Sequence, residues 1–227
     1  MSKTDRPEII LAIETAVGEG SLSLLVRNGK RRSASWKWQH GPISRAENLL
    51  SAVDDLLRFH GIAPADLDTI AVSTGPGSFT GIRIGMAAAL GLAKAVNAKL
   101  AGFSVLRAMV ELASGDIAAA AVPIGKLDAG IQFFEKKDGV WAASSSAESI
   151  AAENLAEAIS SRGQGGEAIV HPGLAPFLSG RNNSDANVRF SGENLAELIA
   201  RLASLGITDD SLEPQYLLNP ARQRAPH

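Results

Sequence analysis

The chain contains no cysteine, few aromatic residues and no excess of charge of either sign. Of its 227 residues, 5% are aromatic and 20% are charged, and the formal net charge is −2. The lack of cysteine excludes disulfide bonds and thiolate metal sites. A nearly neutral chain has no broad basic field that would hold nucleic acid by itself. The first seven residues are polar and lack an apolar core, so we expect no signal peptide and a cytoplasmic protein.

Long apolar runs and paired histidines are missing as well. We see no run of about 18 apolar residues and therefore expect no contact with a membrane. No two of the four histidines lie three or four residues apart, so no helix would offer a histidine pair to a metal ion. No serine stands in a nucleophile-elbow context. What remains is an apolar content of 45% in a chain long enough for one large domain or two small lobes.

The hydrophobic pattern predicts an α/β protein. Three antiparallel strands open the chain, and Asn28-Gly29 is a strong hairpin signal between the second and the third. A helix over 44–60, a strand over 69–73, a helix over 80–96 and a strand over 99–103 follow. We predict a first lobe over 1–103 that carries a partner interface. A second α/β lobe with an extended C-terminal tail would occupy 104–227, with helices at 105–112, 150–160 and 191–205.

The most informative stretch is the strand, turn and helix over 72–93. The turn Gly75-Pro76-Gly77 precedes a helix that Ser78 or Thr80 can cap. Such a turn at a helix N-terminus can bind phosphate through free N–H groups. The Gly-Lys-Ser/Thr ending of a Walker loop is absent, however, so a tight structural turn is favoured over nucleotide binding.

The helix over 80–96 is almost uncharged. Between Gly81 and Val96 its only charged residues are Arg83 and Lys94. A helix that is apolar all round must be buried all round. It is therefore either the central helix of a large core, or a helix with one side on its own sheet and the other on a partner protein. We favour the second interpretation, because the small residues would let another backbone approach closely.

Two segments of the first lobe carry a family resemblance. Ile10–Thr15 and the long signature Ala71–Gly85 resemble the TsaB family, also called YeaZ, and the likeness extends over about residues 8–105. It implies the two-lobed fold of the actin, sugar-kinase and heat-shock-70 (ASKHA) group, with mixed sheets flanked by helices. In that fold the end of the first strand holds a magnesium-linked aspartate. Glu14 stands there in this chain, and we interpret it as a solvated strand-end carboxylate. The remnant of a phosphate loop would then comprise Glu14, Thr15, Gly75, Pro76, Gly77 and Ser78.

The resemblance also implies a function. Proteins of this family are not catalytic, bind no cofactor tightly, and pair with the ATP- and metal-binding subunit TsaD and the ATPase TsaE. The complex places a threonylcarbamoyl group on N6 of adenosine 37 in tRNA, so this chain would meet tRNA only through the complex. Family members form homodimers through the surface that takes TsaD. Here the implied interface comprises Arg45, Leu49, Ala52, Thr80, Arg83, Ile84, Gly85, Ala87, Ala88 and Gly91.

Two other functional classes stay open. An actin-like small-molecule kinase or ATPase would require that this chain itself bind ATP and magnesium. A metal-dependent peptidase would require metal ligands, and the missing histidine pair argues against it. The non-catalytic scaffold subunit is the function that the sequence favours.

Overall fold

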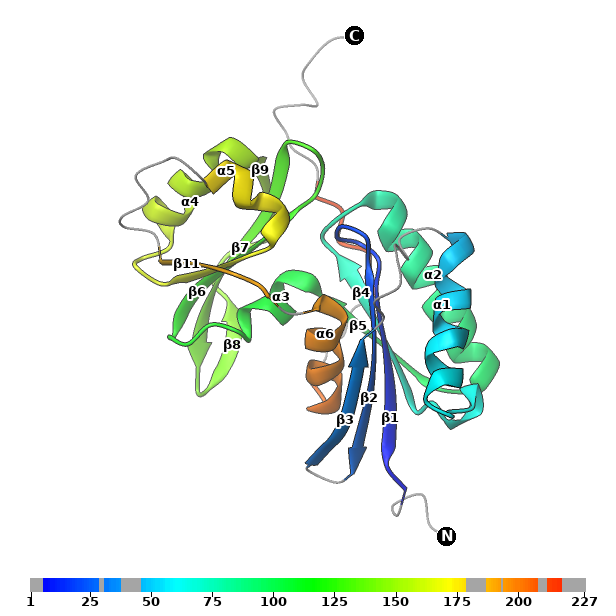
Figure 1. Ribbon diagram of the computed structural model, residues 1–227. Coiled ribbons are helices and arrows are strands. Elements are labelled where there is room, and N and C mark those ends of the chain that lie inside the picture. Colours follow the sequence, from blue (N-terminus) through cyan, green and yellow to red (C-terminus); the bar gives the residue numbers. More distant parts are fainter. Residues whose placement is uncertain are drawn as a thin grey trace.

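The structure, a computed structural model, describes residues 6–28, 31–37, 46–178, 187–192, 194–207 and 212–217. Over these residues the chain forms two α/β lobes, each built on its own sheet (Figure 1). Helices cover the outer face of each sheet, and two further helices lie between the sheets.

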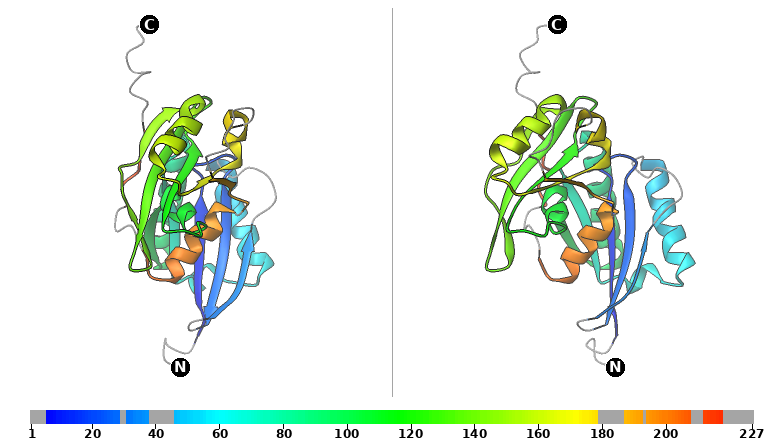
Figure 2. Two further views of the ribbon diagram at one scale, coloured as in Figure 1. Left: turned by 90° about the vertical axis from the view of Figure 1, so that its left-hand side faces the viewer. Right: turned by 60° about the vertical axis from the view of Figure 1, so that its left-hand side comes forward.

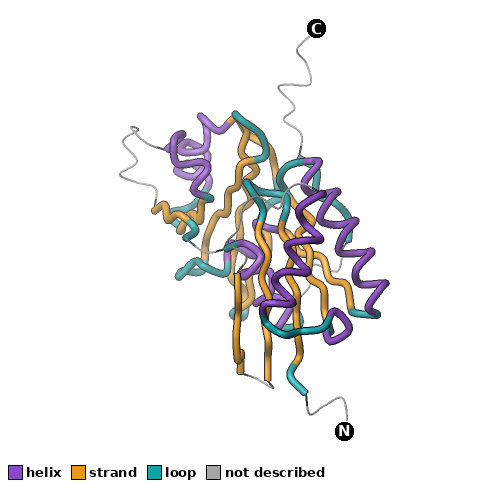
Figure 3. The backbone as a smooth tube through the Cα atoms, turned by 45° about the vertical axis from the view of Figure 1, so that its right-hand side comes forward, coloured by secondary structure: helices purple, strands orange, loops and turns teal. Residues whose placement is uncertain are grey.

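The first sheet has five strands in the order β3-β2-β1-β4-β5. Antiparallel pairs join β1 to β2 and β2 to β3, whereas β4 runs parallel to β1 and β5 parallel to β4. Helices α1 and α2 lie side by side on its outer face (Figure 3). β4 is buried along its whole length because both faces of the sheet are covered. The elements are β1 (Glu8–Glu14), β2 (Ser21–Asn28), β3 (Arg31–Lys37), α1 (Ala46–Phe59), η1 (Pro64–Asp66), β4 (Thr69–Gly75), α2 (Phe79–Val96) and β5 (Lys99–Ser104).

The second sheet repeats this arrangement. Its order is β11-β10-β6-β7-β8, with β9 also paired to β7. Along this order two neighbouring pairs are antiparallel, β6 with β7 and β7 with β8, and two are parallel, β6 with β10 and β10 with β11. The first sheet has the same sequence of pairs, so β6 corresponds to β1 and β10 to β4. The fold is therefore duplicated although the sequence shows no fixed-period repeat. The strands are β6 (Ile117–Pro123), β7 (Asp128–Lys137), β8 (Val140–Ala143), β9 (Glu148–Ala151), β10 (Glu167–Val170) and β11 (Asn187–Phe190).

The helix that follows each sheet packs against the other sheet. Helix α3 (Val105–Val110) follows β5 and packs on β6, whereas α6 (Leu195–Ser204) follows β11 and packs on β1, β2 and β4. The two helices also contact each other, and with both sheets they form a central core that includes Phe103, Phe134 and Ile199. Figure 2 shows α6 beside the strands of the first sheet. The outer face of the second sheet is covered by η2 (Ala152–Asn154), α4 (Leu155–Arg162), η3 (Pro172–Leu174) and α5 (Ala175–Leu178).

Most predicted elements of the first lobe are present, and the second lobe differs in places. The three opening strands, both helices and the strands at 69 and 99 are confirmed. The helix predicted over 150–160 is wrong at its start, because Glu148–Ala151 pairs with β7 as β9. Helix α6 begins at Leu195 and not at Ser191, because Asn194 caps it by accepting a hydrogen bond from Glu197 N at 3.2 Å. The domain boundary at 103/104 stays a prediction, since α6 of the predicted second lobe lies on the first sheet.

Candidate functional site

The turn after β1 lies against a face of α2 that consists of glycine. Gly77, Gly81 and Gly85 are spaced four residues apart. Gly81 and Gly85 therefore share one side of α2, and Gly77 lies just before the start of the helix. A Cβ atom at Gly81 would lie 2.0 Å from Thr15 O, and one at Gly85 would lie 2.2 Å from Thr15 Oγ1. At Gly77 it would lie 2.2 Å from Ala16 O. The backbone of the turn therefore occupies the space that side chains would fill.

Hydrogen bonds fix this contact. Ser78 N donates to Ala16 O at 2.7 Å, and Thr15 Oγ1 donates to Gly81 O at 2.7 Å. Gly81 N donates to Ser78 Oγ at 3.3 Å, which makes Ser78 the N-cap of α2. The N–H of Ser78 and the hydroxyl of Thr15, which could otherwise contact a phosphate, are thus hydrogen-bonded within the chain. The predicted phosphate-loop residues Thr15, Gly77 and Ser78 do come together, but they pack on one another, which favours the structural interpretation of the turn.

Glu14 is buried in this turn. Its side chain is 1% exposed, and its Oε1 accepts hydrogen bonds from Ala16 N at 2.6 Å and Val17 N at 2.9 Å. Burial raises the pKa of Glu14 to about 7, although the two backbone hydrogen bonds act in the opposite direction. The predicted solvated carboxylate is therefore wrong. The reason is that the close approach of α2 carries the turn, including Val17, into the core between the lobes.

The side of α2 away from the glycine face remains open to solvent. Ile82, Ala89 and Ala93 are buried against the first lobe, whereas Ala87 is exposed and Leu90 is 46% exposed. On the neighbouring helix α1, Leu50 is 56% exposed. We call the outward side of α1 and α2 the helix-pair face; its exposed apolar members include Leu50, Ala87, Leu90 and Ala95.

Only part of the predicted interface lies on this surface. Leu49, Ala52 and Gly85 are buried inside the lobe and offer no surface to a partner, which corrects their assignment. Ile84 and Ala88 are half-buried, and Arg45 lies outside the described residues. The exposed members are Thr80, Arg83, Ala87 and Gly91.

The sequence reasoning also missed Leu90, which it placed on the core stripe. Leu90 follows Arg83 by seven residues and precedes Lys94 by four, so it shares the helix side that the two charged residues mark as solvent-facing. That spacing is the signal that could have identified it.

By length and composition alone, α2 could cross a membrane, although the sequence analysis found no apolar run of that length. It has 18 residues and a mean hydropathy of 1.3, and it is the one helix among the described residues with both properties. Its glycine contacts with Thr15 and the burial of Ala89 and Ala93 on the first sheet show that it packs as a helix of a globular lobe.

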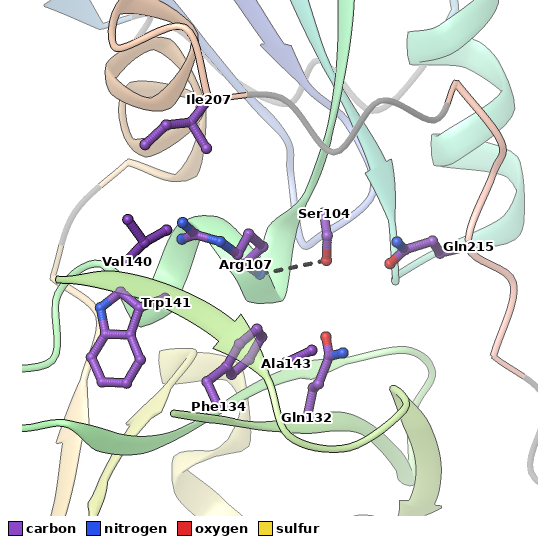
Figure 4. A pocket seen from close by; sticks show the side chains of 9 residues that line it. All are labelled: Ser104, Arg107, Gln132, Phe134, Val140, Trp141, Ala143, Ile207 and Gln215. Carbon is purple, nitrogen blue, oxygen red and sulfur yellow. Dashed lines mark hydrogen bonds between the residues drawn. The ribbon is translucent and has the colours of Figure 1, made fainter. Parts of the chain in front are cut away.

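A cavity of about 380 Å³ lies between α3, the second sheet and the C-terminal segment (Figure 4). Two of its polar side chains are engaged within the chain: an NH1 atom of Arg107 lies 2.5 Å from Oε1 of Glu111, and Gln132 Nε2 donates to Ser145 O at 2.9 Å. A third, Gln215, has a buried Oε1 that accepts no hydrogen bond from the described residues. The rest of the wall is largely apolar, with Phe134 and Trp141. Among the described residues that line it there is no carboxylate and no histidine, which are the usual groups for general acid–base chemistry.

Metal-binding groups do not gather in the part of the chain that the structure describes. No three His, Asp or Glu side chains there are placed to hold an ion together. His171 is engaged elsewhere, since its Nδ1 accepts a hydrogen bond from Gly173 N at 3.0 Å and caps η3. Burial lowers the pKa of His171 and so favours its neutral, accepting form.

Comparison with known sequences finds similarity over the first half of the chain. Residues 44–129 match the family model of TsaD, tRNA N6-adenosine threonylcarbamoyltransferase. The chain is 34% identical over 102 residues to the tRNA threonylcarbamoyladenosine biosynthesis protein TsaB of Escherichia coli K12, a match that covers 45% of this chain and 42% of that protein. The Haemophilus influenzae TsaB is 31% identical over 104 residues, with 46% and 42% covered. The chain thus matches less than half the length of these curated relatives.

Comparison with solved structures extends the likeness to both lobes. YeaZ from Pseudomonas aeruginosa superimposes with a TM-score of 0.65 at 22% identity, over 92% of this chain and 100% of that one. The ethanolamine utilization protein EutJ from Carboxydothermus hydrogenoformans gives 0.50 at 12% identity, over 87% and 89%. The two-lobed actin-like (ASKHA) fold predicted from the sequence is confirmed.

The glycine face predicts opposite effects for two glycines of α2. Gly81→Ala would force a Cβ against Thr15 O and should lower the free energy of unfolding by about 2 kcal/mol or more. At Gly91 a Cβ atom would meet nothing within 4 Å, so Gly91→Ala should raise the free energy of unfolding by up to about 1 kcal/mol through helix propensity. Urea unfolding measures both changes, and a Gly81→Ala protein as stable as Gly91→Ala would contradict the contact.

The buried carboxyl of Glu14 predicts a pH-dependent stability. In the unfolded chain it ionises near pH 4.5, whereas in the folded protein it keeps its proton up to about pH 7. The folded state therefore binds more protons between these values, and the free energy of unfolding should fall by about 3 kcal/mol as pH rises through them. Urea unfolding of wild type and Glu14→Gln from pH 4 to 8 measures this term, which the variant should lack.

The matched control is Glu19→Gln at an exposed position of the same turn, which should follow the wild-type curve. Parallel pH profiles for wild type and Glu14→Gln would show that folding does not change the pKa of Glu14 and would contradict its burial as an uncharged acid.

Proposed function

We propose that this chain, which is similar to TsaB proteins over its first half and shares the fold of YeaZ over both lobes, is a non-catalytic subunit of the complex that synthesises N6-threonylcarbamoyladenosine in tRNA. In this role it pairs with a TsaD-type catalytic subunit through the helix-pair face and holds that subunit in its active shape.

The exposed flank of α2 is the observation that carries the proposal. The glycine face of the helix is occupied by the chain's own turn, yet Ala87 and Leu90 on the outward side remain in water, with Leu50 on the adjoining helix. Covering apolar surface contributes about 2.5 kcal/mol per 100 Å² before the cost of association is subtracted. Exposed apolar area of this kind is typical of a surface that another polypeptide covers.

The matched segment supports a TsaD-type partner. Helices α1 and α2 both fall within residues 44–129, which match the TsaD family model. A TsaD-type subunit would then present a similar helix pair, and the two pairs would pack on each other about an approximate two-fold axis. A second copy of this chain offers the same surface, so the free protein would form a homodimer that competes with the heterodimer.

A non-catalytic role agrees with the close packing of the turn after β1 against α2. The backbone of Thr15 and Ala16 fills the space in front of α2, and the N–H of Ser78 is bonded to it. The alternative of a kinase or ATPase would need that space for phosphate and metal. ATP and metal would accordingly be bound by the partner subunits, including a TsaE-type ATPase, in the cytoplasm.

Charged substitutions on the exposed flank test the pairing. Leu90→Asp and Ala87→Arg should each weaken association with the TsaD-type subunit at least about tenfold, because a charge would be buried without a partner. Analytical ultracentrifugation of the mixed subunits measures the loss. The same variants should shift the free protein from dimer to monomer.

The matched control is Leu205→Asp, which places the same substitution at a 68% exposed leucine after α6. This variant should pair as wild type does, and unfolding curves should show that all three variants stay folded. Undiminished pairing of Leu90→Asp and Ala87→Arg would rule out the helix-pair face as the docking surface.

A further inference from the structure

The C-terminal segment Leu212–Leu217 contacts both lobes and has no helical or strand structure of its own. We call this segment the strap. On the first lobe it lies against the end of β4, where Gln215 N donates a hydrogen bond to Thr74 O at 2.7 Å. The carbonyl oxygen of Gln215 would lie 3.0 Å from a Cβ atom at Gly75, so the two backbones are in close contact. Figure 1 draws the strap in red beside β4.

On the second lobe the strap reaches Gly130 of β7. A Cβ atom at Gly130 would lie 3.2 Å from Leu217 Cδ1 and 3.3 Å from Pro76 Cγ. Pro76 belongs to the turn between β4 and α2, so this turn and the strap contact the second sheet at the same point. Leu217 is half-buried there. The two residues can approach β7 this closely because Gly130 has no side chain.

The side chains of the strap alternate in direction, as they do in an extended chain. Gln215 and Leu217 face the second lobe, since Gln215 lines the cavity with Gln132 of β7 (Figure 4) and Leu217 rests on the same strand. Tyr216, between them, contacts Phe79 at the start of α2, and the two ring centroids are 4.7 Å apart. Three consecutive residues therefore connect β4, α2 and β7.

The strap joins the lobes at a place apart from their shared core. The central core around α3 and α6 includes residues of both sheets and would serve as the pivot of any rotation between the lobes. Such a rotation would move Thr74 of the first lobe away from Gly130 of the second. The strap opposes this movement because it is attached to both. A segment held by a few such contacts detaches more easily than the sheets unfold.

We propose that the strap is a clamp between the lobes. When it is seated, it holds the turn at Pro76 against β7; when it is released, the lobes rotate apart about the central core. Release breaks one backbone hydrogen bond, one ring contact and the packing of one leucine, and it leaves the cores of both lobes intact. The clamp sets the angle between the lobes and does not depend on the proposed function.

Hydrogen exchange on the full chain tests whether these contacts seat the strap. A strap-release variant combines Tyr216→Ala with Leu217→Asp, which removes the stacked ring and places a charge against β7. Exchange of the Gln215 amide should become at least about tenfold faster, because detachment breaks its bond to Thr74 O. Phe79→Ala, at a residue that is 54% exposed, removes the ring partner from the other side and should accelerate the same exchange.

Single-molecule energy transfer tests whether the lobes rotate, and the absence of cysteine allows two specific labels. Ala65→Cys in η1 of the first lobe and Ser160→Cys in α4 of the second provide exposed positions for a donor and an acceptor dye. The labelled wild-type chain should show one population. The strap-release variant should show a second population or a shifted mean, while its urea unfolding curve stays cooperative because both cores are retained.

The matched control is Leu212→Asp, which places the same charge at a 45% exposed leucine of the strap itself. This variant should keep the wild-type exchange rate at Gln215 and the wild-type energy transfer. Exchange at Gln215 as fast in wild type as in an unstructured peptide would overturn the proposal, since the strap would not be seated. Unchanged energy transfer in a strap-release variant with fast exchange would also overturn it, because the lobes would then keep their angle without the strap.

Discussion

The contact between the Thr15–Ala16 turn and the glycine face of α2 determines the arrangement of the first lobe. The helix can approach the end of β1 only because Gly77, Gly81 and Gly85 lack side chains. Glycine within a helix costs roughly 1 kcal/mol relative to alanine, and the buried hydrogen bond from Thr15 to Gly81 offsets part of that cost. The same approach encloses Glu14 and raises its pKa. One backbone contact therefore explains the glycines, the buried acid and the orientation of the helix.

The outward flank of α2 is a consequence of that orientation. A helix that turns its glycines toward the chain's own backbone must turn Arg83, Ala87 and Leu90 toward solvent. The contact on the glycine side of α2 therefore determines which residues of the helix are exposed. Helices α3 and α6 fill the inner side of the two sheets, each packing on the sheet of the other lobe. Helices α3 and α6 thus cover the inner faces of both sheets. The exposed apolar residues of α2 lie on the outer side of the first lobe.

Much of the first lobe could be predicted from local signals. Asn28-Gly29 marks the first hairpin, Ser78 is a cap, and the glycine-rich signature leads to a strand, turn and helix. The features that failed depend on contacts distant in sequence. Glu14 ends a strand and is polar, and only the distant helix α2 buries it. Strand β9 likewise reflects its pairing with β7. The late start of α6 is an exception, because the Asn194 cap is a local contact with Glu197 that the hydrophobic pattern alone does not reveal.

The small residues of α2 show why a partner surface is difficult to read from sequence. Glycine permits close approach of a backbone, but it does not specify whether that backbone belongs to the same chain or to another. In this protein, Gly81 and Gly85 meet Thr15 of their own chain, while Gly91, further along the helix, meets nothing within 4 Å. The small residues of this helix are thus divided between an internal contact and the solvent-exposed surface. The backbone of the turn after β1 fills the space in front of the glycines, whereas the opposite flank of the helix faces solvent, where the proposed partner subunit would bind.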